Sequence, residues 1–148
     1  MNRKIISAIT ALLLLGMLAA SGALFGCKIS NGDDDGQTGI FEDVSVAEAY
    51  SLIQENMTNS NFVILDVRTG EEFDSGHIER ALNIDFYASD YGDQLDMLDK
   101  DKVYLVYCRS SNRSGQAMDN MEDLGFTEVY NMSGGISAWD DAGYAIVQ

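Results

Sequence analysis

The hydrophobic pattern of residues 40–148 alternates between short apolar runs and stretches with helical spacing. Four apolar runs predict strands, at residues 62–65, 81–84, 103–107 and 128–130. Helical segments are predicted before, between and after them, near residues 46–53, 71–75, 93–98, 117–124 and 136–139. Strands that alternate with helices over this length predict an α/β domain with a mainly parallel sheet and right-handed crossovers.

The first 27 residues have a different pattern, typical of a targeting segment. Arg3 and Lys4 form a basic start, and no charged residue follows up to Cys27. The ending Leu24-Phe25-Gly26-Cys27 resembles the lipobox of bacterial lipoproteins, in which the signal is cut before a cysteine that is lipidated. The alternative is an uncleaved anchor, because the uncharged run is long enough to span a bilayer. Either interpretation predicts a membrane-anchored domain outside the cytoplasmic membrane.

Residues 28–39 are rich in Gly, Ser, Asn and Asp, and are predicted to form a flexible acidic linker rather than a metal site. Residues 40–148 then have the length of one ordinary domain. From Lys28 onward the chain carries 24 acidic and seven basic residues, a net charge of −17. This charge argues against nucleic acid or anionic lipid as a partner.

A polar loop follows the third predicted strand and precedes a helix, and it begins with Cys108. Its other residues are Arg109, Ser110, Ser111, Asn112, Arg113 and Ser114. Ligands bind at the carboxyl ends of strands in open α/β sheets. Unpaired backbone N–H groups at a helix start, together with two arginines, favour a thiolate. We therefore predict that Cys108 is a reactive thiol and that the two arginines attract an anionic substrate; the alternative is a buried, inert cysteine.

Three motifs, in order along the chain, resemble the signatures of the rhodanese family. The first comprises Asp66-Val67-Arg68, Glu72-Phe73, Gly76-His77-Ile78 and Ala81, and the second is the loop that begins at Cys108. The third is Gly134-Gly135-Ile136 with Trp139. The resemblance runs from about Phe41 to Val147. It implies a rhodanese-like three-layer α/β domain, with a mainly parallel central sheet of about five strands flanked by helices.

The resemblance also implies an activity, that of a sulfurtransferase of the thiosulfate or persulfide type. Cys108 would attack a sulfane donor, carry the outer sulfur as a persulfide and pass it to a thiol, cyanide or protein acceptor. The loop amides from Arg109 to Arg113 would cradle the persulfide. The two arginines would attract an anionic donor such as thiosulfate. No metal and no organic cofactor are implied.

Four residues of the first motif correspond to supporting positions in the family: Asp66, Arg68, Glu72 and His77. Their residue types allow a simpler interpretation, in which Asp66 pairs with an arginine and Arg68 with Glu72. His77 is the single histidine of the chain and the one candidate for a Cys–His pair. A histidine that is hydrogen-bonded at the turn after Gly76 is the favoured interpretation. Packing and turn roles are likewise favoured for Trp139 and the Gly134–Gly135 pair.

The chain departs from the family pattern at two turns. Ser111 stands where the family often has glycine, so this position is expected to need an unusual φ. The family continues its first signature with Ile-Pro-Gly-Ala, whereas this chain has Ile78-Glu79-Arg80-Ala81. That turn is expected to be built differently, with little effect on the chemistry.

Two other classes of function remain open. A cysteine phosphatase or arsenate reductase of the same fold has a loop with five residues between cysteine and arginine, whereas four separate Cys108 from Arg113 here. Rhodanese-like domains also act as non-catalytic binding or sulfur-relay modules. In an oxidising compartment a disulfide between Cys27 and Cys108 is a further alternative, which lipidation of Cys27 would exclude.

Overall fold

The computed structural model describes residues 39–148. The predicted targeting segment with Cys27, and the predicted linker up to residue 38, lie outside the described residues. Within residues 39–148, no helix has both the length and the apolar character needed to cross a bilayer.

The described chain is built around one sheet of five parallel strands, in the order β1-β5-β4-β2-β3. The strands are β1 (Ile40–Val44), β2 (Phe62–Asp66), β3 (Leu82–Asn83), β4 (Val103–Tyr107) and β5 (Glu128–Met132). The expectation of an α/β fold with a central parallel sheet of about five strands is confirmed.

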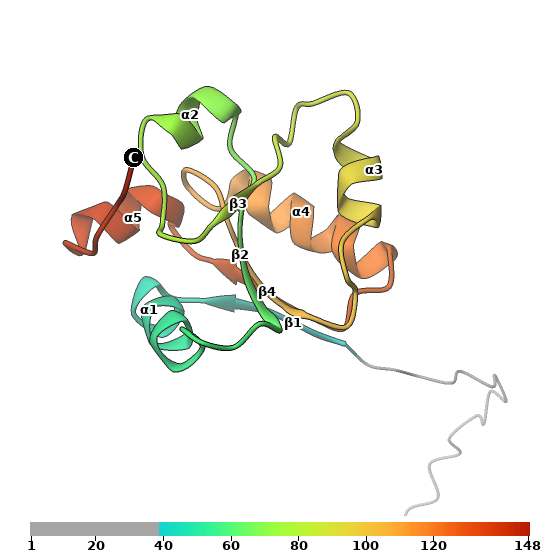
Figure 1. Cartoon of the computed structure of the whole chain (residues 1–148), viewed down its shortest axis with the longest axis horizontal. Helices are drawn as coiled ribbons and strands as arrows, with labels where there is room; N and C mark the ends of the chain where they lie inside the picture. The colour runs from blue at the N-terminus through green and yellow to red at the C-terminus, as the bar shows by residue number, and fades with distance from the viewer. Residues whose placement is uncertain (1–38) are drawn as a thin grey trace, which may run out of the picture. The chain divides into compact units, whose positions relative to one another are not determined.

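Helices cover both faces of the sheet, which makes three layers (Figure 1). They are α1 (Val46–Glu55), α2 (Gly70–Asp74), α3 (Tyr91–Asp96), α4 (Asn112–Asp123) and α5 (Gly135–Asp141). Leu95 of α3 and Met121 of α4 belong to the core on one face. Ala49 of α1 and Trp139 of α5 belong to the core on the other.

The central strand β4 contributes side chains to both cores, because successive side chains of a strand point to opposite faces. Tyr104 and Val106 pack into the core with α3 and α4, whereas Leu105 and Tyr107 pack into the core with α1 and α5. Its continuous apolar run therefore reflects a strand covered on both faces. Cys108 follows directly at its carboxyl end.

The hydrophobic pattern did not predict β1. Its sequence carries Glu42 and Asp43, and most of its residues are exposed or half-buried because it lies at the edge of the sheet and pairs with β5 alone. An edge strand with one wet face does not need an apolar run. Helix α1, the next element, could be predicted from the sequence, because Ser45 and Glu48 form a capping box at its start.

The order of the strands determines where a ligand site can form. From β2 the chain continues to β3 toward one edge of the sheet, and from β4 it continues to β5 toward the other. The connections after β2 and β4, two neighbouring strands, therefore diverge, and this divergence leaves a crevice at their carboxyl ends. Asp66 ends β2 and Cys108 follows β4, so the predicted site residues lie at this switch point.

Candidate active site

Cys108 lies at the base of the loop between β4 and α4, and is 1% exposed. Within residues 39–148 it forms no disulfide. Burial alone raises the pKa of a thiol, because it removes water from the thiolate. In this loop the pKa of the Cys108 thiol is nevertheless lowered, since hydrogen bonds from the Ser114 hydroxyl and from the backbone N–H groups of Ser114, Ser110 and Arg113 outweigh burial. The loop thus favours the thiolate form of Cys108.

Ser114 supplies the side-chain donor of this set. It is fully buried in the first turn of α4, and its Oγ lies 3.5 Å from Cys108 Sγ. The sequence had predicted amide donors between Arg109 and Arg113, and the structure places the donors at Ser110, Arg113 and Ser114. Ser110 and Arg113 lie within the predicted range and Ser114 lies one residue beyond it.

Ser111 adopts a left-handed conformation, with φ 70° and ψ −4°. The expectation of an unusual φ at this position is confirmed. Its side chain does not cap the helix that begins after it; its Oγ donates to the Ser110 carbonyl at 2.7 Å. Asn112 opens α4 and accepts from Gln116 Nε2. These side chains shape the loop, and their contacts do not reach the sulfur.

Arg113 is held by Glu72 in a two-pronged ion pair, Nη1 to Oε2 at 2.7 Å and Nη2 to Oε1 at 2.9 Å. This hydrogen bonding lowers the pKa of Glu72 to about 2 and raises the pKa of Arg113. The Arg113 guanidinium also lies 5.6 Å from the centre of the Tyr87 ring. Arg113 thus fastens the active-site loop to α2 through a paired charge, and its part in attracting an anionic substrate stays a prediction.

The other expected ion pair also has a different partner. Arg68 binds Asp66 rather than Glu72: its Nη2 lies 2.6 Å from Asp66 Oδ2, and its Nε contacts both carboxylate oxygens. Arg68 Nη2 also donates to the Gly76 carbonyl at 2.7 Å. Both charged groups are buried, so this pair fixes the loop after β2 beside the active-site loop. The suggestion that Asp66 pairs with an arginine is confirmed.

His77 takes the structural role that was favoured. Its ring stacks on Phe73 at 3.7 Å, and its Nδ1–H donates to the Phe73 carbonyl at 3.1 Å. Its backbone pairs with Val147 near the end of the chain. These contacts account for the histidine without a catalytic role.

The glycine pair after β5 presses against the active-site loop. Gly135 has φ 59°, and a Cβ placed there would lie 2.5 Å from the Cys108 carbonyl oxygen and 2.5 Å from the Arg109 carbonyl carbon. The next two N–H groups, of Ile136 and Ser137, donate to the carbonyls of Cys108 and Arg109 at 2.9 and 3.1 Å. The glycine motif was predicted as a turn and packing element; its close approach to the loop could not be read from spacing.

The turn after Ile78 contains Glu79 and Arg80 where the family pattern has Pro-Gly. Arg80 adopts φ 69°, and the Ala81 N–H donates to the Ile78 carbonyl at 3.0 Å. The Arg80 guanidinium donates to the Met57 carbonyl. Arg80 thus takes the positive φ at the position where the family has glycine. The residues of this turn are not among those that contact the Cys108 sulfur or line the hollow beside the active-site loop.

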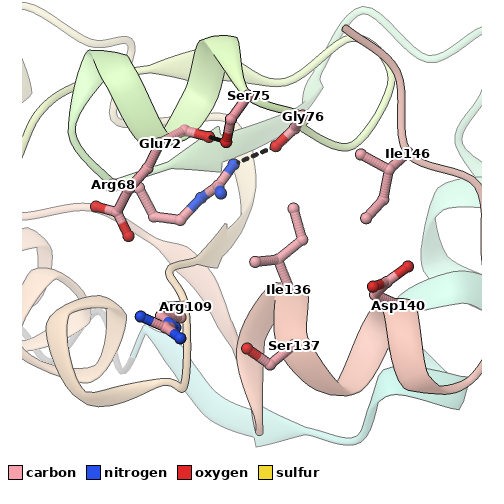
Figure 2. A pocket seen from close by; sticks show the side chains of 9 residues that line it. All are labelled: Arg68, Glu72, Ser75, Gly76, Arg109, Ile136, Ser137, Asp140 and Ile146. Atoms are coloured by element: carbon pink, nitrogen blue, oxygen red, sulfur yellow. Dashed lines mark hydrogen bonds between the residues drawn. The ribbon is translucent and has the colours of Figure 1, made fainter.

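A hollow of about 350 Å³ lies beside the active-site loop. It meets the loop at Arg109, and its other walls come from the region after β2, from α5 and from the C-terminal segment (Figure 2). The lining residues are Arg68, Glu72, Ser75, Gly76, Arg109, Ile136, Ser137, Asp140 and Ile146. The arrangement supports nucleophilic chemistry by a thiolate next to a hollow with polar walls.

Residues 39–148 contain no group of three or more His, Cys, Asp or Glu side chains that could hold a metal ion. Four donors that converge on a single sulfur can stabilise a persulfide anion as well as a thiolate, because the outer sulfur would carry the same charge.

The Rhodanese-like domain model matches residues 45–142. Protein HIGH ARSENIC CONTENT 1 of Arabidopsis thaliana is 34% identical over 114 residues, which cover 70% of this chain and 66% of that protein. Thiosulfate sulfurtransferase GlpE of Coxiella burnetii is 30% identical over 101 residues, covering 68% of this chain and 88% of that protein.

The same similarity is found among solved structures. A rhodanese-related protein from Thermoplasma volcanium is 30% identical, with a TM-score of 0.60, and the match covers 72% of this chain and 97% of that one. The family model spans the site from Asp66 through the loop of Cys108 to Trp139. The chain belongs to the rhodanese-like domain family.

Proposed function

We propose that this protein is a sulfurtransferase that carries a sulfane sulfur as a persulfide on Cys108. The observation that carries the proposal is the placement of Cys108, a buried cysteine at the carboxyl end of β4 whose sulfur lies 3.5 Å from the Ser114 hydroxyl and whose pKa is lowered by the hydrogen bonds of the loop. Such a site favours the anionic sulfur both before and after it accepts a second sulfur atom.

The proposed reaction has two half-reactions. The Cys108 thiolate attacks the outer sulfur of thiosulfate; a new S–S bond forms, the S–S bond of the donor breaks, and sulfite leaves with the electron pair. In the second half-reaction an acceptor nucleophile attacks the outer sulfur of the persulfide, and the Cys108 thiolate leaves. The proposal includes no separate base at the cysteine, because the hydrogen bonds that lower the pKa of Cys108 favour the thiolate.

Thiosulfate as the donor is supported by two features. The Coxiella burnetii relative is named a thiosulfate sulfurtransferase. In addition, Arg109 lines the hollow next to the loop, and within residues 39–148 its guanidinium takes part in no ion pair. Arg109 therefore offers an anionic donor a positive charge that is not already paired within the described residues.

The test is sulfur transfer from thiosulfate to cyanide, measured as thiocyanate, with intact-mass detection of the persulfide. Wild-type protein is expected to gain the mass of one sulfur atom and to turn over. Cys108→Ser is expected to do neither, whereas Ser110→Ala should retain both, because Ser110 contributes its backbone N–H alone. Turnover that persists in Cys108→Ser would exclude Cys108 as the carrier.

A second candidate is reduction of arsenate or hydrolysis of a phosphate ester. We include this candidate because the name of the Arabidopsis relative refers to arsenic content. The loop argues against it, because four residues separate Cys108 from Arg113 and Glu72 already holds the guanidinium. Arsenate reduction or phosphatase activity without persulfide formation would select this candidate. Persulfide formation without turnover of any acceptor would indicate a sulfur-relay module.

We also propose that the protein is a lipoprotein. Residues 1–27 would be the signal, Cys27 the lipidated residue and residues 28–39 the linker to the domain. The basic start and the lipobox-like ending support it. Cell fractionation with labelled fatty acid should place wild-type protein in the membrane fraction with lipid attached. Cys27→Ser should lose the label; membrane retention of an unlabelled wild-type chain of full length would favour an uncleaved anchor.

A further inference from the structure

The hollow beside the active-site loop carries two opposite charges that the described structure leaves free. Arg109 lies at one side of it and Asp140 of α5 at the other, with Ser137 and Ile136 between them (Figure 2). Within residues 39–148 neither the Arg109 guanidinium nor the Asp140 carboxylate takes part in an ion pair. The hollow therefore presents a separated positive and negative charge to whatever enters it.

The remaining charged groups of the hollow are committed to protein partners. Arg68 is bound by Asp66 and by the Gly76 carbonyl. Glu72 is bound by Arg113. A ligand consequently meets Arg109 and Asp140 as the charges available for pairing, together with the aliphatic surfaces of Ile136 and Ile146.

The hollow is also linked to the reacting cysteine through the backbone. Arg109 is the residue after Cys108, and the N–H of Ile136 donates to the Cys108 carbonyl at 2.9 Å. Its volume of about 350 Å³ lies at the lower end of the roughly 300–1,000 Å³ of small-molecule sites. This size suits a small thiol better than a folded protein chain.

We propose that this hollow is the acceptor subsite, and that Asp140 selects small thiols that carry an ammonium group, with Arg109 available for a carboxylate on the same molecule. The inference rests on the proposed function and specifies its acceptor. The acceptor thiolate attacks the outer sulfur of the Cys108 persulfide; a new S–S bond forms in the acceptor, the protein S–S bond breaks, and Cys108 leaves as the thiolate. Asp140 is a specificity residue and exchanges no proton.

The experiment measures formation of the Cys108 persulfide (loading) separately from transfer of its outer sulfur to the acceptor (discharge). Full-length protein is first loaded with thiosulfate, and loading is verified by intact mass; failure here would overturn the proposed function itself. The loaded protein is then mixed rapidly with cysteamine, 2-mercaptoethanol or 3-mercaptopropionate, which are small thiols with a positive, neutral or negative second group. The second-order rate of persulfide loss is measured for each thiol.

Asp140→Asn is expected to slow discharge by cysteamine about twofold to fivefold, the effect of one exposed ion pair. Discharge by 3-mercaptopropionate should become faster, and discharge by 2-mercaptoethanol should stay the same. Each thiol is compared with itself between variants, so differences in thiol pKa cancel. The matched control is Asp141→Asn, because Asp141 is the exposed neighbour, does not line the hollow and changes the net charge equally.

Two results would overturn the inference while leaving the proposed function intact. In the first, Asp140→Asn and Asp141→Asn change the three rates alike, which assigns the effect to the overall charge of the molecule. In the second, Asp140→Asn leaves the rate with cysteamine unchanged. Arg109→Gln gives an independent check, since it should slow discharge by 3-mercaptopropionate more than discharge by cysteamine.

Discussion

At the scale of single residues, the state of Cys108 follows from a balance between burial and hydrogen bonding. A hydrogen bond to a charged group contributes about 1.5–3 kcal/mol, and Cys108 receives one from a side chain and three from the backbone. Burial is the largest single cause and raises the pKa, but the hydrogen bonds together outweigh it. The pKa of Cys108 is therefore below its ordinary value of 9.0.

Ser114→Ala should raise the pKa of Cys108. The 3.5 Å distance between Ser114 Oγ and Cys108 Sγ is long, so we expect the loss to lie at the lower end of that range and the ratio of thiolate to thiol to fall about tenfold. The check is the ultraviolet absorbance of the thiolate against pH, taken as the difference from Cys108→Ser. Ser110→Ala should titrate like wild type; an unchanged curve for Ser114→Ala would contradict the assignment.

The ion pair of Glu72 with Arg113 predicts a pH-dependent contribution to stability. The pKa of Glu72 is about 2 in the folded protein against an ordinary 4.5, so its contribution is complete above pH 4.5 and is lost as pH falls toward 2. Because the Glu72 side chain is 31% exposed, solvent screening limits the contribution to about 1–2 kcal/mol.

Glu72→Gln should accordingly lower the Tm at pH 6, and the difference from wild type should shrink between pH 4.5 and pH 2. Thermal unfolding followed by circular dichroism at several pH values measures it. Glu71→Gln is the matched control, since Glu71 lies beside it in the first turn of α2 without the Arg113 contact. A difference that stays constant with pH would show that the pair is not the cause.

At the scale of elements, two short connections determine the shape of the active-site loop. Ser111→Gly should stabilise the protein, because a left-handed serine costs about 1–2 kcal/mol whereas the entropic penalty of glycine is about 0.5–1 kcal/mol. We expect a Tm higher by a few degrees with sulfur transfer retained. Ser110→Gly is the control, because Ser110 has no positive φ, and its Tm should not increase. An equal rise in Tm for both variants would contradict the presence of backbone strain at Ser111.

Gly135→Ala should have the opposite effect. A Cβ at this position would lie 2.5 Å from two backbone atoms of the loop, and φ 59° disfavours any side chain. We expect a loss of stability of about 2 kcal/mol or more and, in the fraction that folds, slower persulfide formation, since the loop must shift. Gly92→Ala, which would contact nothing within 4 Å, is the control for both readouts.

The same elements show what sequence could and could not predict. The apolar run before Cys108 and the helix after it were predictable, because buried strands and amphipathic helices have distinct periods. The partner of Arg113 was not, because it depends on where the fold brings a carboxylate 41 residues away. A local signal existed, since Thr69 and Glu72 form a capping box that fixes this carboxylate at the start of α2.

At the scale of the whole molecule, the parallel sheet gathers its separate motifs at one edge. Asp66 at the end of β2, Cys108 after β4 and Gly135 after β5 all lie at carboxyl ends of neighbouring strands. Their order along the chain indicated a shared site, because parallel strands end at the same edge. The hollow with Asp140 could not be predicted, since Asp140 lies on an exposed face of α5 that only the folded chain brings near Arg109.

The central claim is that Cys108 carries sulfur, and the intact mass of the protein after brief incubation with thiosulfate tests it most directly. The account predicts the added mass of one sulfur atom on wild-type protein, located at Cys108 by peptide mapping and removed by cyanide. It predicts no added mass on Cys108→Ser. A wild-type mass that remains unchanged by thiosulfate and by a persulfide donor, or an added sulfur on another residue, would contradict the account.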